Sequence, residues 1–347
     1  MTDQTVLATQ RTVEGTSATL AVRGLVVQLR LAGAWVPVVR GIDIDLAPGE
    51  TLGIVGESGS GKTLSMMAIL GLHPGGVRYR TSGQAWFDGV DLLALDEPAL
   101  ARVRGRRIGT ILQDPLAALN PLRRIGDQIT EAAQLHLGIG RSQARRRAAD
   151  LLSYVGIPGA ARRLDDHPHQ FSGGMRQRAL IAMALAAEPE LLVADEPTTA
   201  LDVTIQAQIL DLLARLRADM RMSMIVITHD LGVVAGIADR MAIMYAGRIV
   251  ELGGTEAVMG APDHPYTSGL LASIPRIDGP RMARLDSIPG MPPVRMDEIR
   301  GCAFAPRCRH AREACYLNEQ VIEALAPGHG AACEVHPFAG DPPPMRA

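Results

Sequence analysis

Lysine is almost absent from this chain of 347 residues: Lys62 is the only lysine among its 35 lysine and arginine residues. Aromatic residues make up only 3%, so a buried core has to be aliphatic, and a hydrophobic content of 47% makes that feasible. The formal net charge of −2 argues against a general nucleic-acid-binding protein. The length favours one large domain with an appendage over a single core.

Long apolar segments are also missing. Residues 1–18 are polar, so they predict a disordered tail and no signal peptide. No window of about 18 consecutive apolar residues occurs, and therefore no membrane-spanning helix is expected. These absences predict a soluble or peripheral protein of the cytoplasm.

Short apolar runs alternate with helical patterns between residues 19 and 255. Strands are predicted at 19–31, 36–46, 51–55, 83–92 with a turn at Asp88-Gly89, 191–194 and 224–228, and helices at 62–72, at 203–219 and over most of 115–185. This alternation favours a mainly parallel sheet covered on both faces. After about residue 255 proline and glycine become frequent, so a domain boundary is predicted there.

One segment fits the phosphate-binding pattern G-x-x-x-x-G-K-[ST]. Its residues are Gly56, Glu57, Ser58, Gly59, Ser60, Gly61, Lys62 and Thr63. A strand before it and a helix after it favour a true phosphate loop over a chance glycine loop. The glycines let backbone N–H groups point at phosphate oxygens, and the helix N-terminus adds positive potential. Lys62 is expected to reach the β- and γ-phosphates of ATP, and Thr63 to bind Mg²⁺.

Two acidic residues, Asp195 and Glu196, follow the strand predicted at 191–194. In a parallel sheet, the carboxyl ends of the strands face the ligand crevice. We expect Asp195 to hold Mg²⁺ and Glu196 to act as general base on the attacking water. An acidic loop cap is the alternative for an isolated pair, but the upstream phosphate loop favours the catalytic interpretation.

The segment Phe171-Ser172-Gly173-Gly174-Met175-Arg176-Gln177-Arg178 resembles the signature motif of ABC-transporter ATPases. Phe171 and Met175 stand where Leu and Gln are usual. Further matches follow in the family's order: Gln113 resembles the Q-loop glutamine, Ala200-Leu201-Asp202 the D-loop, and His229 the switch histidine. The resemblance covers about residues 19–255. It implies the α/β fold of a P-loop NTPase of the ABC ATPase type, with a RecA-like core, an antiparallel β subdomain and a helical subdomain at about 115–185.

Three segments narrow the resemblance to the peptide and nickel importer branch: 113–121, 169–178 and 264–267. The implied function is ATP hydrolysis that energises import of dipeptides or oligopeptides. A nickel or other small-solute importer is the alternative. A soluble ABC ATPase is less favoured because the chain has one cassette and no long coiled-coil insertion. A non-hydrolysing subunit is less favoured because Glu196 and His229 are both present.

The resemblance also implies a mechanism and partners. Two such domains close head to tail, so Ser172, Gly173 and Gly174 act on the nucleotide of a partner, and Asp202 is counted with the nucleotide-binding residues. His229 holds the attacking water with Glu196, while Gln113 links Mg²⁺ or water to the helical insert. The implied partners are two transmembrane permease subunits, an extracytoplasmic substrate-binding protein and a second ATPase subunit, favoured to be a different chain, at the cytoplasmic face of the inner membrane. No nucleic-acid partner is expected.

An aromatic residue upstream of the phosphate loop usually stacks on adenine in this family. Trp35 is the nearest candidate. Its offset from the loop leaves two interpretations open, adenine stacking and an ordinary loop or surface residue.

All four cysteines lie late in the chain: Cys302, Cys308, Cys315 and Cys333. In a reducing compartment, clustered thiols favour metal binding over disulfides. Zinc sites usually contain C-x2-C pairs, which are missing here, and the wider gaps suit a [4Fe-4S] cluster. Residues 301–308 also resemble a C-terminal motif of peptide-importer ATPases, some of which carry such a cluster. We expect 256–347 to form that type of C-terminal domain with a structural or redox-sensing cluster, while zinc, free thiols or a disulfide remain alternatives.

Overall fold

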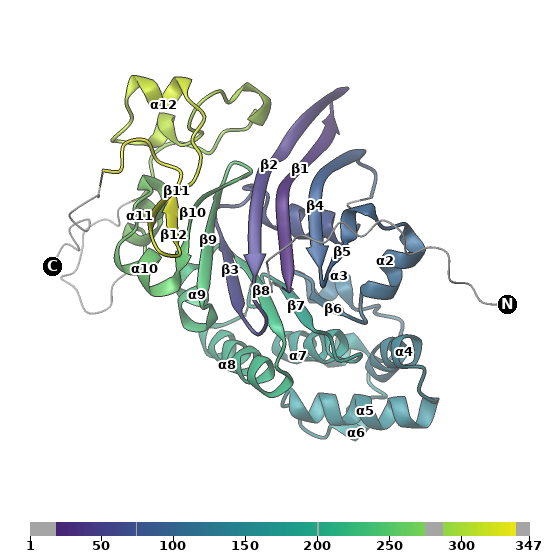
Figure 1. Ribbon diagram of the computed structural model, residues 1–347. Coiled ribbons are helices and arrows are strands. Elements are labelled where there is room, and N and C mark those ends of the chain that lie inside the picture. The colour runs from purple at the N-terminus through teal and green to yellow at the C-terminus, as the bar shows by residue number, and fades with distance from the viewer. Residues whose placement is uncertain (1–18, 74, 200, 275–286, 338–347) are drawn as a thin grey trace.

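Two sheets flanked by helices organise the chain (Figure 1). The computed structural model describes residues 19–73, 75–199, 201–274 and 287–337. The predicted disordered tail, Ala200 of the D-loop match and the prolines at 275 and 280 lie outside the described residues. Among the described residues, no helix is both long enough and apolar enough to cross a membrane.

The first sheet is antiparallel, with the strand order β2-β1-β4-β5. Its strands are β1 (Leu20–Leu31), β2 (Ala34–Leu46), β4 (Tyr79–Phe87) and β5 (Val90–Asp91). The strands predicted at 19–31 and 36–46 are thereby confirmed. The turn predicted at Asp88-Gly89 is also confirmed, and both residues have the positive φ values, 47° and 77°, that such a two-residue hairpin turn requires.

The second sheet has eight strands in the order β11-β12-β10-β9-β3-β8-β7-β6. Its bounds are β3 (Thr51–Val55), β6 (Ile108–Ile111), β7 (Leu191–Asp195), β8 (Ser223–Thr228), β9 (Arg240–Tyr245), β10 (Arg248–Gly254), β11 (Glu323–Ala326) and β12 (His329–Ala331). The strands β9, β3, β8, β7 and β6 are parallel, whereas β10, β12 and β11 continue the sheet in antiparallel pairing. A mainly parallel core is therefore confirmed.

Helices connect and cover these strands. The α-helices are α1 (Lys62–Ile69), α2 (Glu97–Val103), α3 (Pro115–Ala118), α4 (Ile125–Leu137), α5 (Arg141–Tyr154), α6 (Ala160–Arg163), α7 (Gly173–Ala184), α8 (Val203–Met220), α9 (Leu231–Ile237), α10 (Thr255–Gly260), α11 (Pro265–Ala272) and α12 (Glu313–Leu317). Short 3-10 helices are η1 (Leu92–Ala94), η2 (Pro168–Gln170), η3 (Met296–Glu298) and η4 (Ala305–Arg307). The helical character predicted for 115–185 is confirmed.

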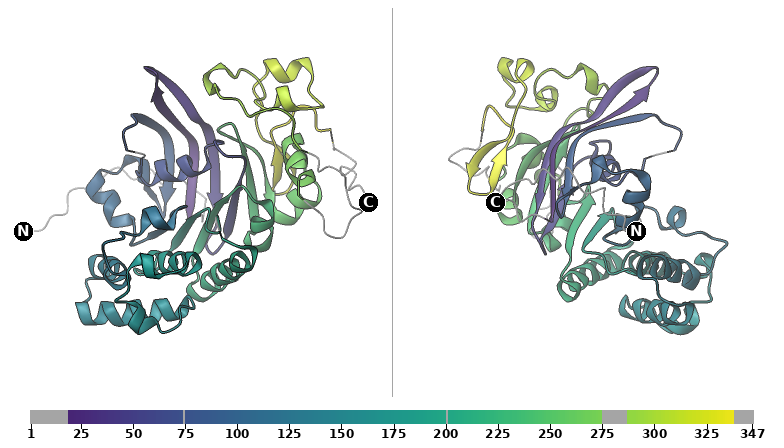
Figure 2. Two further views of the ribbon diagram at one scale, coloured as in Figure 1. Left: turned by 180° about the vertical axis from the view of Figure 1, so that it is seen from behind. Right: turned by 45° about the vertical axis from the view of Figure 1, so that its right-hand side comes forward.

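Alternate residues of the central strands enter different hydrophobic clusters. Leu192 and Val226 pack with the helical layer of α4, α5, α7 and α8, which lies along one side of the core sheet in both views of Figure 2. Val193 and Ile225 face the opposite cluster, which includes the first antiparallel sheet. Burial on both faces explains why these strands read as continuous apolar runs in the sequence.

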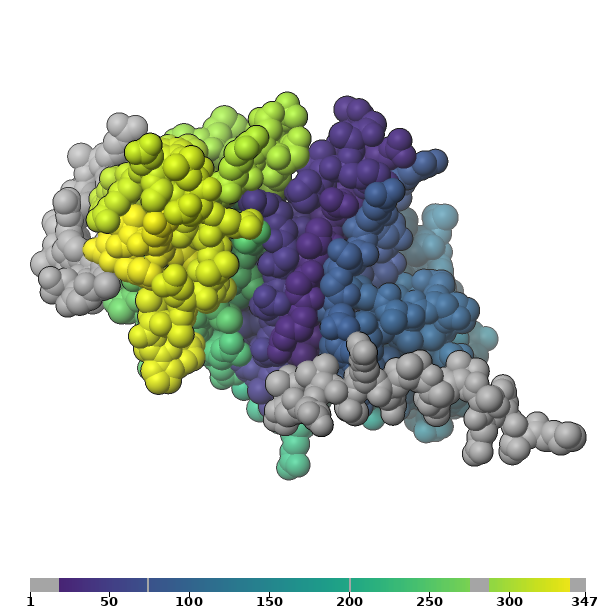
Figure 3. Space-filling model, turned by 45° about the horizontal axis from the view of Figure 1, so that its top comes forward, coloured from purple at the N-terminus to yellow at the C-terminus, as the bar shows by residue number. Residues whose placement is uncertain are grey.

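The C-terminal segment extends the core sheet. β12 pairs with β10 through Glu251↔Ala331 and Leu252↔Gly330, and the Ala332 N–H donates to the Val250 carbonyl at 2.8 Å. A third cluster joins residues of β3, β9 and β10 to Tyr266 and Phe304. Figure 3 shows this segment in yellow beside the first strands, and η3 contacts β2. Residues far apart in sequence thus share one packed body, although the domain boundary near residue 255 stays a prediction.

Candidate nucleotide-binding and catalytic site

The phosphate loop connects β3 to α1, at the carboxyl end of a buried strand. Gly59 and Gly61 have φ values of +80° and +101°, a conformation that only glycine adopts without strain. A Cβ atom on Gly56 would lie 2.1 Å from the Met244 carbonyl oxygen, so the backbone of β9 passes against the loop. The glycine positions of the motif therefore follow from backbone turns and close packing.

Lys62 lies inside this loop with only 6% of its surface exposed. Its ammonium donates to the carbonyl oxygens of Gly56 at 2.6 Å and Glu57 at 3.0 Å. Burial lowers the pKa of Lys62, while the nearby carboxylates of Glu196, Asp195 and Glu57 act to raise it. The charge is held at the loop centre, where phosphate oxygens would replace these carbonyl acceptors.

Asp195 ends β7 and faces the first residues of α1. Thr63 donates its hydroxyl hydrogen to Asp195 Oδ1 at 2.9 Å. Asp195 is 1% exposed, and this burial raises the pKa of its carboxyl against the opposing hydrogen bond from Thr63. A hydroxyl and a carboxylate in contact offer the hard oxygen ligands that Mg²⁺ prefers.

Glu196 and His229 meet across the ends of β7 and β8. The His229 Nδ1 and Glu196 Oε1 atoms are 2.9 Å apart, and Thr199 donates its hydroxyl hydrogen to the other carboxylate oxygen. Burial acts to raise the pKa of Glu196, but the hydrogen bonds from Thr199 and His229 outweigh it and the pKa is lowered. Glu196 has a φ of 47°, a left-handed backbone that redirects its side chain after the strand.

The structure thus places four predicted residues side by side: Thr63, Asp195, Glu196 and His229. Thr63 touches Asp195, and the next residue, Glu196, touches His229. Gln113 follows β6, whose Ile111 pairs with Ala194 of β7, so it lies at the same edge of the sheet. It is exposed to solvent there. This edge can hold a metal-bound polyphosphate and supply a base for water.

The predicted signature residues lie elsewhere, at the start of α7. Ser172 is its N-cap and accepts a hydrogen bond from the Met175 N–H at 3.3 Å. Ser172 and Gly173 are exposed, and Gly174 packs so closely that an added Cβ would lie 2.9 Å from Ile205. Asp202 is likewise the N-cap of α8, accepting from the Ile205 N–H at 3.0 Å. Two helix N-termini therefore face outward near each other.

Comparison with known proteins identifies the family. A model described as "ABC transporter" matches residues 39–199, and one described as "Oligopeptide/dipeptide transporter, C-terminal region" matches residues 250–315. A putative peptide import ATP-binding protein of Brucella melitensis is 48% identical over 324 residues, which cover 90% of this chain and 96% of that protein. The chain belongs to the peptide-import branch of the ABC-transporter ATP-binding proteins.

Other relatives agree with this placement. The oligopeptide transport ATP-binding protein OppD of Bacillus subtilis is 48% identical over 310 residues, with 89% of this chain and 87% of that protein covered. The ATP-binding cassette MJ0796, a post-hydrolysis dimer bound to ADP and phosphate, superposes with a TM-score of 0.61 at 25% identity over 68% of this chain and 98% of that one. The predicted ABC ATPase fold is confirmed, and the chain is an ATPase of this family.

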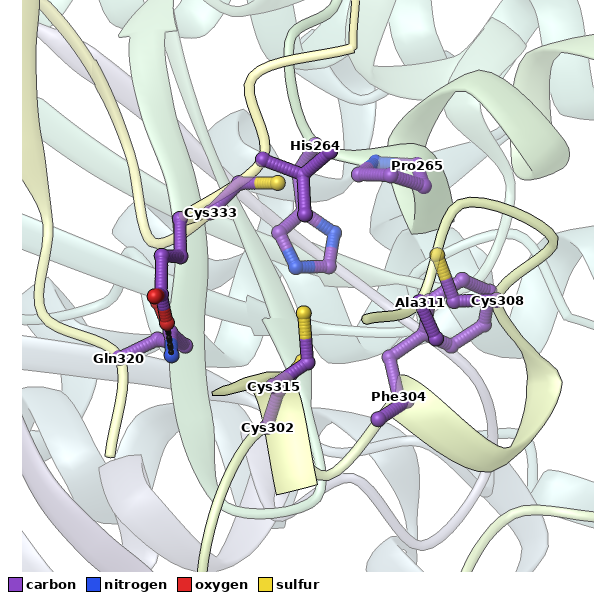
Figure 4. Close-up of a pocket in the computed structure, with 12 residues that line it drawn as sticks. His264, Pro265, Cys302, Phe304, Cys308, Ala311, Cys315, Gln320 and Cys333 are labelled. Carbon is purple, nitrogen blue, oxygen red and sulfur yellow. Dashed lines mark hydrogen bonds between the residues drawn. The ribbon is translucent and has the colours of Figure 1, made fainter. Parts of the chain in front are cut away.

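The four cysteines line a single pocket together with His264 and Phe304. Figure 4 shows the sulfur atoms of Cys308, Cys315 and Cys333 around the His264 ring, with Cys302 behind Cys315. Burial raises the pKa of the Cys302, Cys308 and Cys333 thiols, for Cys333 to about 11. In the described parts of the chain, however, no group of three or more His, Cys, Asp or Glu residues is arranged to hold a metal ion. The predicted metal site is therefore not confirmed.

Two contacts to the phosphate loop were not predicted from the sequence. Arg307 forms a bidentate ion pair with the Glu57 carboxylate, at 2.8 and 3.0 Å, and the Tyr266 hydroxyl accepts the Glu57 N–H at 2.8 Å. Glu57 is thereby directed toward the C-terminal segment. Tyr266 and Arg307 both lie in segments singled out for their family resemblance, but nothing local indicated their target.

Trp35 lies on β2 with the guanidinium of Arg80 at 4.0 Å from its ring centroid and that of Arg30 at 5.9 Å. These cation–π contacts hold the half-buried ring in place. Adenine stacking by Trp35 stays a prediction.

Proposed function

We propose that ATP hydrolysis at this site energises import of dipeptides or oligopeptides across the inner membrane, with the chain bound at its cytoplasmic face. The observation that carries the proposal is the continuous contact from the phosphate loop through Asp195 and Glu196 to His229. It assembles a phosphate cradle, a metal ligand pair and a base at one edge of the parallel sheet. The similarity to peptide-import ATP-binding proteins supports the cargo class.

In the proposed mechanism, each residue at this edge has one task. Lys62 and the backbone N–H groups of Gly59 to Thr63 bind the β- and γ-phosphates. Thr63 and Asp195 would hold Mg²⁺ together with Gln113, and the ion would neutralise charge on the phosphates. Glu196, kept ionised by its hydrogen bonds, takes a proton from the attacking water, and His229 orients that water toward the γ-phosphate.

Assembly supplies the rest of each site. The exposed Ser172 and Gly173 at the N-terminus of α7 are suited to the γ-phosphate on a partner ATPase subunit. We infer that this partner is a different chain, so the ATPase pair is a heterodimer. Leu116 and Leu122 expose 61% and 87% of their surfaces just after Gln113, an apolar surface suited to the permease subunits. The substrate-binding protein outside the membrane completes the importer.

We also propose that the cysteine pocket holds a [4Fe-4S] cluster, with zinc as the alternative. The donor set supports it, because four thiols from separate turns line one pocket. Backbone groups hydrogen-bond to each sulfur: Phe304 and Ala305 to Cys302, His310 and Ala311 to Cys308, Arg312 to Cys315, and Val335 and His336 to Cys333. Such N–H···S bonds favour thiolates bound to metal. A bound cluster would supply a structural crosslink or a redox sensor.

The catalytic assignment is tested with Glu196→Gln in the reconstituted importer. We expect hydrolysis to fall at least about 100-fold, because a general base typically contributes that much, while ATP binding persists and the closed dimer accumulates. Glu256→Gln, which removes an exposed carboxylate on α10, is the matched control and should leave hydrolysis unchanged. Normal turnover in Glu196→Gln would contradict the assignment.

Cargo is tested in proteoliposomes that contain the permeases and the loaded substrate-binding protein. Dipeptides or oligopeptides should stimulate ATP hydrolysis and accumulate inside in an ATP-dependent manner. Stimulation by nickel instead of peptides would favour the small-solute alternative. Co-purification of the complex shows whether the second ATPase is a different chain, and two copies of this chain in one complex would refute the heterodimer.

The cluster is tested by absorption spectroscopy of anaerobically purified protein. Broad visible bands with about four iron atoms per chain are expected, and Cys308→Ser should abolish them. A colourless protein with stoichiometric zinc would support the alternative instead.

A further inference from the structure

Glu57 places a negative charge inside a loop that binds a polyphosphate. Two of its polar groups are held from outside the loop: the carboxylate by Arg307 and the backbone N–H by the Tyr266 hydroxyl. Its carbonyl oxygen accepts from Lys62 within the loop. The two contacts join positions 250 and 209 residues apart. The loop conformation around Gly56 and Glu57 is therefore fixed partly by residues beyond the ATPase core.

Arg307 is itself rigidly placed at the end of η4. Its side chain is only 6% exposed, and it donates further hydrogen bonds to the Tyr245 hydroxyl at 3.2 Å and the Pro289 carbonyl at 2.9 Å. Tyr245, Tyr266 and Phe304 pack against one another, with ring centroids 4.6 to 5.4 Å apart. In a chain with 3% aromatic residues, this group of three rings is concentrated where the C-terminal segment meets the phosphate loop.

The charge balance gives the ion pair a function. An unpaired Glu57 carboxylate would repel the ATP phosphates, and it would also compete for Lys62, on which it exerts an attractive charge interaction. At an effective dielectric constant of about 20, the interaction between two unit charges in the same loop is large enough for roughly a tenfold or larger change in affinity. The fork of Arg307 neutralises the carboxylate and fixes its direction, as a bidentate guanidinium pair does.

We propose that Arg307 is a positioning residue of this chain's own ATP site, which aligns and neutralises the phosphate loop through Glu57. The C-terminal segment thus completes the nucleotide site in cis, in addition to any role of its cysteines. The proposal rests on the ATP site described above, and it assigns Arg307 no contact with ATP.

The test uses the full-length chain in the assembled importer, with Mg·ATP as the probe. Arg307→Gln should raise the KM for ATP about tenfold and leave kcat within about threefold, because the catalytic groups at Glu196 remain in place. In the double variant with Glu57→Gln the unpaired charge is gone, so the KM should return toward the wild-type value. Arg300→Gln removes the same charge from an exposed position of the same segment and should have no effect.

A purely structural role of Arg307 predicts a different pattern. Its loss would then lower the thermal stability and the active fraction, and Glu57→Gln would not rescue it. An unchanged KM in folded Arg307→Gln, or a double variant as impaired as the single one, overturns the proposal. If Arg307→Gln does not fold, Arg307→Lys replaces it in the test. This variant keeps the positive charge without the bidentate guanidinium and should raise the KM for ATP about threefold. A wild-type KM in Arg307→Lys would refute the positioning role. Failure of the ATP-site assignment would give a result distinct from these, because the wild-type protein itself would then not hydrolyse ATP.

Discussion

Replacing Glu251 with glutamine should loosen the attachment of the C-terminal segment to the core sheet. The Glu251 carboxylate has no exposed surface and accepts three hydrogen bonds: from the Asp263 N–H at 2.8 Å, the His264 N–H at 3.1 Å and His329 Nε2 at 2.9 Å. Two of these donors precede α11, and His329 begins β12. Since β12 and β10 share only a short ladder, this side chain is a major link between them.

The cost follows from the geometry of the three donors. An amide oxygen can replace Oε1, which serves Asp263 and His329, but the amide NH₂ then faces the His264 N–H, donor against donor. One hydrogen bond to a charged group is lost and one buried N–H is left without an acceptor, so we expect a loss of about 2–5 kcal/mol. Asp211→Asn, at an exposed carboxylate on α8, is the control and should change stability by less than about 0.5 kcal/mol.

This loss should also depend on pH. The hydrogen bond with Glu251 raises the pKa of His329, with the Asp263 charge acting in the same direction. The protonated ring therefore stabilises the folded state most below about pH 6.5, and that gain disappears as pH rises through the raised pKa. Glu251→Gln should accordingly cost more at about pH 6.5 than at about pH 8.5. Burial lowers the pKa of His264 to about 3, so this buried neutral ring makes the folded state less stable as pH falls below about 6.5. The wild type and Glu251→Gln share this contribution, so it cancels in the difference between their stabilities.

Urea denaturation and amide hydrogen exchange of β10 and β12 measure the effect. Faster exchange confined to these strands and to 263–267, with a stability loss in the expected range, would support the argument. A loss below about 1 kcal/mol would show that water or a rearranged backbone replaces the carboxylate, and the reasoning from buried donors would then be wrong.

Three further predictions concern the ATP site. Gly56→Ala should abolish detectable ATP binding in a filter assay, because its Cβ would lie 2.1 Å from the Met244 carbonyl oxygen. His229→Gln should lower kcat at least about tenfold with a KM within threefold, measured by phosphate release, because the role proposed for His229 is to orient the attacking water and not to bind nucleotide. Chelation of Mg²⁺ should stop hydrolysis. Asp195→Asn should raise the Mg²⁺ concentration that gives the half-maximal rate about tenfold or more. Hydrolysis rates insensitive to either change would contradict the metal assignment.

Local patterns predict which residues meet at the edge of the sheet that we propose to be catalytic. The phosphate loop needs a buried strand, positive-φ glycines and a helix start within a few residues, and all of these are encoded side by side. Strand β3 was predicted with its observed bounds, Thr51–Val55. Asp195 and Glu196 could be placed because parallel strands share their carboxyl edge. In each case the signal and the structure lie within the same short segment.

Features that depend on distant pairing were missed or misplaced. The strand predicted at 83–92 begins earlier, at Tyr79, because residues 79–84 are mostly exposed and are held by backbone pairing with β1 and not by an apolar pattern. The sequence patterns also predict neither β9 nor β10. The cysteine spacing predicts a metal site with four thiolate ligands. The four cysteines line one pocket, but no metal-holding arrangement is found among the described residues, because spacing alone does not fix how the sulfur atoms are arranged.

Glu57 and Glu251 together connect the C-terminal segment to the core sheet and to the phosphate loop. Glu251 holds this segment to β10, while Arg307 of the same segment holds Glu57 of the phosphate loop. Loosening the attachment at Glu251 should therefore disturb the contact between Arg307 and Glu57. No atom of Glu251 belongs to the phosphate loop, yet Glu251→Gln should raise the KM for ATP. In a background that already carries Arg307→Gln, Glu251→Gln should cause no further increase, because the contact between Arg307 and Glu57 that transmits the effect is already lost. Independent, additive effects of the two substitutions would mean that the segment and the ATP site are only neighbours.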